Sequence, residues 1–148
     1  MVKLVEGLDI KGKRVAVALA GDQPSSALSD AVGHVGGEAY QFAPYHYHLP
    51  EDLSEIGAFV RRVLAGEISL LAFTTPPQVT ILMDAAEKLG LAQQLLEALN
   101  SSATVAAVGT VTAGALARYR VKVLVRPPED DETRMGLVES IEAFFRGA

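Results

Sequence analysis

The sequence contains no cysteine, and this absence excludes several kinds of site at once. Disulfide bonds, zinc sites built on thiolates and a cysteine nucleophile all require that side chain. A basic excess is also missing, because 13 Lys and Arg residues are outnumbered by 18 Asp and Glu residues, which gives a net charge of −5. We therefore expect no nucleic-acid partner, since little positive charge is available to neutralise phosphates.

Long apolar runs are lacking as well. Runs such as Ile68–Phe73 are far shorter than the roughly 20 apolar residues that a membrane-spanning helix requires. The first residues, Met1–Gly7, contain an acid and no apolar segment of the kind found in signal peptides. The sequence thus predicts a cytoplasmic protein with no membrane partner.

The hydrophobic content is that of a globular protein. With 148 residues, 49% of them hydrophobic, the chain is long enough for one compact domain and short for two. We therefore predict a single α/β domain over residues 1–148, in which residues 1–12 are a weakly patterned lead-in.

Short apolar runs alternate with amphipathic stretches along the chain. The predicted strands are Arg14–Ala20, Glu38–Tyr45, Ile68–Thr74, Ala103–Val108 and Val121–Val125. The predicted helices are Ser25–Val35, Glu51–Ala65, Gln78–Leu89, Leu91–Leu99, Val111–Tyr119 and Thr133–Phe145. Because every connection between strands contains a helix, parallel strands with right-handed crossovers are expected. The predicted fold is α/β, with a doubly wound five-stranded parallel sheet in the flavodoxin-like order 2-1-3-4-5.

Small hydroxyl residues precede several of these helices, at the sheet edge where ligands bind in such folds. They are Ser25 and Ser26, Thr74 and Thr75, and Thr110 and Thr112, and the turn at Gly21 lies on the same edge. Helix N-termini carry unpaired amides and a partial positive charge, so they can bind carboxylates or phosphates. The same hydroxyls could instead cap their helices, and the pattern alone leaves both roles open.

Two other polar groups invite functional interpretations. His46 and His48 share one strand face but have no third ligand at metal spacing, so we predict solvent-facing histidines and no metal site. Glu129–Glu132 is a run of four acids, which is more typical of a solvated loop than of a cation site.

Motifs in the predicted loops also occur in a definite order. They are Gly21-Asp22-Gln23, Ala43-Pro44-Tyr45 leading to Leu49-Pro50, Phe73-Thr74-Thr75-Pro76, Val108-Gly109-Thr110-Val111-Thr112-Ala113, and Thr133-Arg134-Met135-Gly136. In this order and spacing they resemble uroporphyrinogen-III synthase. The resemblance spans nearly the whole chain but only the carboxyl-terminal half of that family's usual length.

The resemblance implies a two-lobed enzyme whose lobes are joined by a linker, with the substrate in the cleft between them. The linker would fall near residues 45–50, which are therefore a candidate hinge. Two arrangements follow for a half-length chain. Its five strands could close into one lobe that lacks the N-terminal half, or two chains could exchange halves as a homodimer.

The resemblance also implies a lyase reaction of haem biosynthesis that needs no cofactor. The linear tetrapyrrole hydroxymethylbilane is closed into uroporphyrinogen III, with inversion of ring D and loss of water. Tyr45 matches the family's functional tyrosine and would donate a proton to the leaving hydroxyl group. The expected substrate-binding residues are Gly21, Ser25, Thr74, Thr75, Pro76, Gly109, Thr110 and Thr112. The alternatives are a non-catalytic tetrapyrrole-binding or regulatory module excised from a longer chain, and a general anion-binding α/β module.

Overall fold

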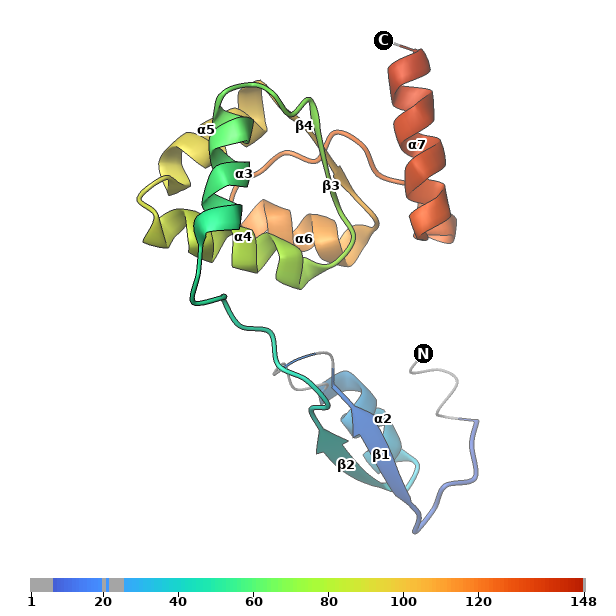
Figure 1. The fold of residues 1–148 in the computed structure, drawn as a ribbon. Helices are drawn as coiled ribbons and strands as arrows, with labels where there is room; N and C mark the ends of the chain where they lie inside the picture. Colours follow the sequence, from blue (N-terminus) through green and yellow to red (C-terminus); the bar gives the residue numbers. More distant parts are fainter. Residues whose placement is uncertain (1–6, 20, 22–25, 148) are drawn as a thin grey trace. The chain divides into compact units, whose positions relative to one another are not determined.

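The computed structural model describes residues 7–19, 21 and 26–147. The chain divides into two compact units, Met1–His48 and Leu49–Ala148. Each unit has its own pair of parallel strands and its own helices (Figure 1). None of the described helices combines the length and the apolar character needed to cross a membrane.

The first unit is a small β-α-β motif. Strands β1 (Arg14–Ala18) and β2 (Glu38–Phe42) pair in parallel, and helix α2 (Ser26–His34) connects them and packs against both. Its buried apolar side chains include Val17 of β1 and Ala31 and Val32 of α2. Parallel neighbours require such a crossover, because a tight turn can join only antiparallel strands.

The second unit contains the larger core. Strands β3 (Leu70–Phe73) and β4 (Thr104–Ala107) pair in parallel, and Val125 adds one parallel bridge to Ala106. Its helices are α3 (Ser54–Leu64), α4 (Pro76–Lys88), α5 (Ala92–Ser101), α6 (Thr110–Arg118) and α7 (Arg134–Arg146), with the short 3-10 helix η1 (Glu129–Asp131) before α7.

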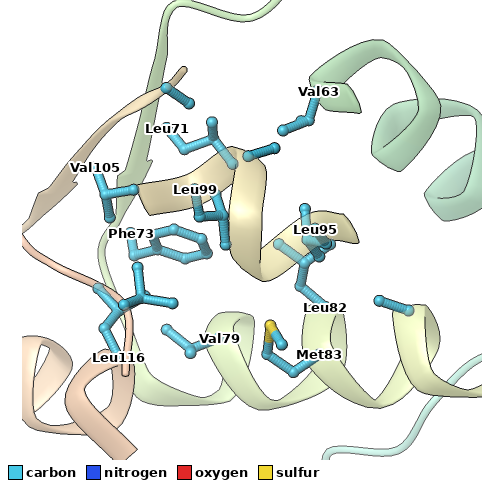
Figure 2. Packing of buried hydrophobic residues seen from close by; sticks show 14 of the residues in the cluster. Val63, Leu71, Phe73, Val79, Leu82, Met83, Leu95, Leu99, Val105 and Leu116 are labelled. Carbon is cyan, nitrogen blue, oxygen red and sulfur yellow. The ribbon is translucent and has the colours of Figure 1, made fainter. Parts of the chain in front are cut away.

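Helices cover both faces of this second sheet. Side chains alternate along a strand, so Leu71 and Phe73 point to one face and pack with buried residues of α3, α4, α5 and α6 (Figure 2). On the other face, Leu137 of α7 packs against Ala106 and Val125. Accordingly, α7 lies on one side of β3 and β4 and the other helices lie on the opposite side (Figure 1). The layered α/β arrangement predicted from the alternating pattern is therefore present in this unit.

The predicted single five-stranded sheet is not formed by the described residues. Parallel pairing is confirmed, but the strands form two separate two-stranded sheets. The expected fifth strand is reduced to the bridge at Val125, whose carbonyl accepts from the N–H of Ala107 at 3.0 Å. At the start of this segment, the N–H of Lys122 donates to the side-chain oxygen of Asn100. Alternation of strands and helices indicates the direction of pairing, but it does not indicate which strands share a sheet.

Candidate functional site

The predicted site residues fall into two groups, one in each unit. Gly21 follows β1 and Tyr45 follows β2, whereas Thr74–Pro76 follow β3 and Gly109 and Thr110 follow β4. The loops after two adjacent parallel strands lie at the same edge of their sheet. Ser25 lies outside the described residues, and of Ser26 only its place at the start of α2 is described.

In the first unit, Tyr45 lies against a second tyrosine, Tyr47. Their ring centroids are 5.2 Å apart with an interplanar angle of 83°, an edge-to-face arrangement that aromatic pairs favour. The neighbouring phenol of Tyr45 raises the pKa of Tyr47 above its ordinary value of 10.0. The predicted proton donor therefore has a second phenol side chain beside it.

Gly21 makes room for that neighbour. Its φ of +75° lies in the left-handed region that favours glycine, and a Cβ at this position would lie 2.7 Å from Cδ2 of Tyr47. Gly21 is one of the residues predicted to bind substrate. In the structure, the absence of a side chain at Gly21 leaves room for the ring of Tyr47.

In the second unit, the N-terminus of α6 holds a carboxylate from the protein itself. Oε1 of Glu132 accepts hydrogen bonds from the backbone N–H of Thr110, at 2.5 Å, and from the Thr110 hydroxyl. Nη1 of Arg126 donates to the same hydroxyl oxygen at 3.1 Å. Gly109 is buried beside this contact, and a Cβ on it would lie 2.6 Å from Oε2 of Glu132.

These contacts favour the ionised form of Glu132. The hydrogen bonds from Thr110 lower the pKa of the Glu132 carboxyl below its ordinary value, and the positive charge of Arg126 lowers it further. The other three acids of the predicted loop, Glu129–Asp131, form η1. Glu129 and Asp130 are exposed, as expected for a solvated loop, whereas Asp131 is half-buried. Glu132 is also exposed, but its carboxylate turns back onto α6.

Helix α4 has fewer free backbone N–H groups at its N-terminus than α6. Thr75 is its N-cap residue, and the helix begins with Pro76 and Pro77, which have no backbone N–H. The amides of Thr74 and Thr75 donate to Oε1 of Gln78, at 2.8 and 3.2 Å. Amide donors in the first turn of α4 therefore start only at Gln78, whereas those of α6 start at Thr110.

Thr112 does not cap α6. The N-cap residue is Gly109, and Thr112 is the third residue of the helix, with only 3% of its surface exposed. The capping role considered for this residue was therefore wrong, because Gly109 occupies the N-cap position and Thr112 lies inside the first turn.

Two other features of the described residues do not form a polar site. No three metal-binding side chains come together among these residues. A hollow of about 250 Å³ lies along β3 and is lined by Phe59, Leu70–Phe73 and Leu82. Because its lining side chains are apolar, this hollow does not suit a carboxylate ligand.

Several residues of these groups were missed in the sequence. Gln78 lies three residues after Thr75, which is the capping-box spacing and could have indicated it. Tyr47 is two residues after Tyr45, the spacing of neighbours on one strand face. Arg126 and Glu132 carry no local signal, since they reach Thr110 over 16 and 22 residues of sequence.

Comparisons with known proteins match this chain over nearly its whole length. The sequence model of the family described as Uroporphyrinogen-III synthase HemD matches residues 1–147. YjjA of Bacillus subtilis (strain 168), described as an uncharacterized protein, is 30% identical over 127 residues, which are 86% of this chain and 46% of YjjA.

Solved structures agree with the family match. Wild-type uroporphyrinogen III synthase from the extremely thermophilic bacterium Thermus thermophilus is 32% identical, with a TM-score of 0.59 over 99% of this chain and 54% of that chain. Another structure of the Thermus thermophilus enzyme is 31% identical, with a TM-score of 0.57 over 96% of this chain and 54% of that chain. The chain thus spans about half the length of these relatives, and it belongs to the uroporphyrinogen-III synthase family.

Proposed function

We propose that this chain supplies part of a uroporphyrinogen-III synthase site, which converts hydroxymethylbilane to uroporphyrinogen III. Membership of the family supports this proposal, as do the polar groups at the ends of its strands. The reaction makes the chain a lyase of porphyrin and haem biosynthesis, which we place in the cytoplasm.

The carboxylate held at α6 is the observation that carries the proposal. Hydroxymethylbilane is a polycarboxylate, and the Thr110 N–H and hydroxyl already bind a carboxylate, that of Glu132. The first backbone N–H groups of a helix have no carbonyl partner within it, so Val111 and Thr112 extend the same donor set. A substrate carboxylate would take the place of Glu132 and receive these hydrogen bonds.

Tyr45 would assist the departure of the hydroxyl group. When the bond between the hydroxymethyl carbon and its oxygen breaks, the electron pair stays on oxygen, which takes the phenol proton and leaves as water. The proton that the substrate loses on ring closure then restores the phenol. Tyr45 is 47% exposed, so a substrate can reach its hydroxyl group.

Inversion of ring D requires control of the substrate's conformation as well as acid assistance. Holding a bent chain needs contacts from two sides, and this chain has about half the length of the family enzyme. We therefore propose that a second wall completes the cleft. It would come from another copy that exchanges halves about residues 45–50, or from the N-terminal half that this sequence lacks.

The proposal is tested by incubating the protein with fresh hydroxymethylbilane over a wide range of protein concentrations. The product isomers are separated by chromatography, because cyclisation without an enzyme yields the uninverted isomer. We expect isomer III, with a specific activity that rises with concentration if two copies are needed. The Tyr45→Phe variant should lose most of this activity, whereas Tyr40→Phe, which removes an exposed phenol of β2, should keep it.

Formation of only the uninverted isomer at every concentration would contradict independent catalysis. The half length of the chain favours one alternative, a non-catalytic tetrapyrrole-binding module. Binding of hydroxymethylbilane in the same samples, measured by calorimetry without formation of isomer III, would favour that alternative.

A further inference from the structure

The parallel sheet of the first unit has one open face. Val17 is buried in β1 on the side where α2 packs, so its neighbours Ala16 and Ala18 point to the opposite side. Tyr40 and Phe42 of β2 are the register partners of these two alanines and lie beside them. Tyr40 is 67% exposed and Phe42 is 42% exposed. These four residues, Ala16, Ala18, Tyr40 and Phe42, are the open sheet face.

A parallel sheet of this kind needs a second helical layer. Parallel sheets occur almost only where helices cover both faces. Among residues 7–19, 21 and 26–48, α2 is the only helix that packs on this sheet, and it covers one face. In layered α/β folds, an apolar sheet face is buried by the apolar stripe of a helix. The open sheet face is therefore suited to a helix with an unused apolar stripe.

Helix α7 of the second unit has such a stripe. Leu137 packs against β4 from one side of α7, whereas Met135 and Val138 lie on the exposed side. Phe145 continues the exposed side, because it follows Val138 by seven residues, or about two helical turns. Met135 is 67% exposed, and Val138 and Phe145 are each 49% exposed. Met135, Val138 and Phe145 are the outer stripe of α7.

A pair of opposite charges lies at a similar distance along each surface. Arg14 and Glu38 are register partners at the start of the sheet, about 13 Å along the strands from the last residues of the open sheet face. On α7, Glu142 pairs with Arg146 at 2.9 Å and lies about 10 Å along the helix from Met135. A helix antiparallel to the strands can therefore lay its outer stripe on the open sheet face and bring the two charged pairs together. A network of four charges stabilises a contact more than isolated exposed pairs do.

We propose that two copies of this chain form a symmetric dimer, in which the outer stripe of α7 from one copy covers the open sheet face of the other. Each copy gives one stripe and one sheet face, so a two-fold axis produces two identical contacts and leaves neither surface open. Two copies also restore about the length of the Thermus thermophilus enzyme, of which one copy spans 54%. The inference rests on the part of the proposed function in which another copy exchanges halves about residues 45–50.

The first test is the mass in solution. One chain has a mass of 15.7 kDa, and we expect light scattering to give twice this value at high concentration and to fall toward it on dilution. Tyr40→Glu and Val138→Glu each place a charge in the apolar contact, so each should raise the dissociation constant of the dimer by at least about tenfold. Both side chains are exposed in a single copy, so the fold should persist in circular dichroism.

Two control variants accompany this measurement. Tyr40→Phe keeps the aromatic ring of the open sheet face, and it should leave the dissociation constant unchanged. Gln94→Glu adds the same charge as the test variants at an exposed position of α5, outside both surfaces, and it should also leave the constant unchanged. Equal weakening by Gln94→Glu and Val138→Glu would overturn the assignment of the contact to α7.

The second test locates the contact. Because the sequence has no cysteine, a single introduced cysteine marks one chosen position. Ala18→Cys protein and Val138→Cys protein are mixed and treated with a short bis-maleimide, and the expected product joins one copy of each. Gln94→Cys in place of Val138→Cys is the control and should give little of the joined product. In the Ala18→Cys/Val138→Cys double variant, a crosslink confined to single chains would overturn the inference, because α7 of the same chain would then cover the sheet.

The outcomes separate this inference from the proposed function. A mass of 15.7 kDa at every concentration overturns the dimer and leaves the open sheet face to the N-terminal half that this sequence lacks. A dimer with the expected crosslink that forms no isomer III supports the inference and contradicts the proposed catalysis. Formation of isomer III by a protein that stays monomeric supports the catalysis and overturns the inference.

Discussion

Glu132 and Thr110 are 22 residues apart in the sequence, yet one oxygen of the Glu132 carboxylate accepts both the N–H and the hydroxyl hydrogen bond of Thr110. The contact places a negative charge at the N-terminus of α6, where the helix dipole favours it. The proposed binding site for a substrate carboxylate is thus occupied by a side chain of the protein. This relationship leads to most of the predictions below.

Removal of Glu132 should strengthen binding of hydroxymethylbilane. A site that an internal group fills for about nine-tenths of the time binds its ligand roughly tenfold more weakly than the open site. We therefore expect Glu132→Ala to lower the Kd about tenfold in calorimetric titrations. Glu129→Ala, which removes an exposed acid of η1, is the control and should change the Kd little. Weaker binding by Glu132→Ala would show instead that Glu132 contributes to the ligand site.

The same contact predicts a pH dependence of stability. The pKa of Glu132 is lower in the folded protein than its ordinary value of 4.5, so the ionised carboxylate stabilises the fold. This contribution is complete above about pH 4.5 and is lost as the pH falls through the lower folded value. The difference in unfolding free energy between the wild type and Glu132→Gln, measured with urea, should therefore be constant near neutral pH and shrink in acid. If the difference in unfolding free energy between the wild type and Glu132→Gln persists at about pH 2, it does not have an electrostatic origin. Glu129→Gln is the control, because it removes a neighbouring acid of η1 and leaves the contact between Glu132 and Thr110 in place.

Gly109→Ala should disturb this contact by overpacking. The new Cβ would lie 2.6 Å from Oε2 of Glu132, so the carboxylate must move away from Thr110. We expect a small loss of unfolding free energy, measured with urea, because the obstructing carboxylate ends a flexible, exposed side chain that can move. In a Glu132→Ala background most of this loss should disappear, because the obstructing side chain is gone.

A glycine in the same helix provides the control for that variant. A Cβ at Gly114 would meet nothing within 4 Å, and this residue is exposed. Because alanine is the better helix former, Gly114→Ala should stabilise the protein by up to about 1 kcal/mol. Equal destabilisation by both substitutions would argue against a specific contact at Gly109.

Gln78 should matter for stability and not for ligand binding. Its side-chain oxygen accepts from the amides of Thr74 and Thr75 at the start of α4. Loss of such a cap typically costs about 1 kcal/mol, which is the effect that we expect for Gln78→Ala in urea unfolding. Gln94→Ala, at an exposed position of α5, should be nearly neutral. A large change in the Kd for hydroxymethylbilane in Gln78→Ala would instead assign ligand contacts to α4.

Much of the local structure followed from local patterns. Apolar runs and amphipathic stretches predicted four of the strands and most of the helices, because side-chain periodicity is a local property. The helical crossovers between strands also predicted that the strands pair in parallel. The ordered loop motifs also predicted the family. The pattern placed Thr75 just before one helix and Gly109 with Thr110 just before another. Helix α4 does follow Thr75, but it begins at Pro76 and not at Gln78, and α6 begins at Thr110 itself.

Contacts between distant segments could not be obtained in this way. The tertiary structure decided that the strands form two sheets, that Glu132 reaches Thr110, and that Tyr47 lies on Gly21 beside Tyr45. Each of these depends on the path of the chain between residues that are far apart, and no pattern of neighbouring side chains encodes that path. A run of acidic residues has the same sequence pattern whether its last side chain faces water or a helix N-terminus. Only the folded backbone brings the helix N-terminus next to that side chain.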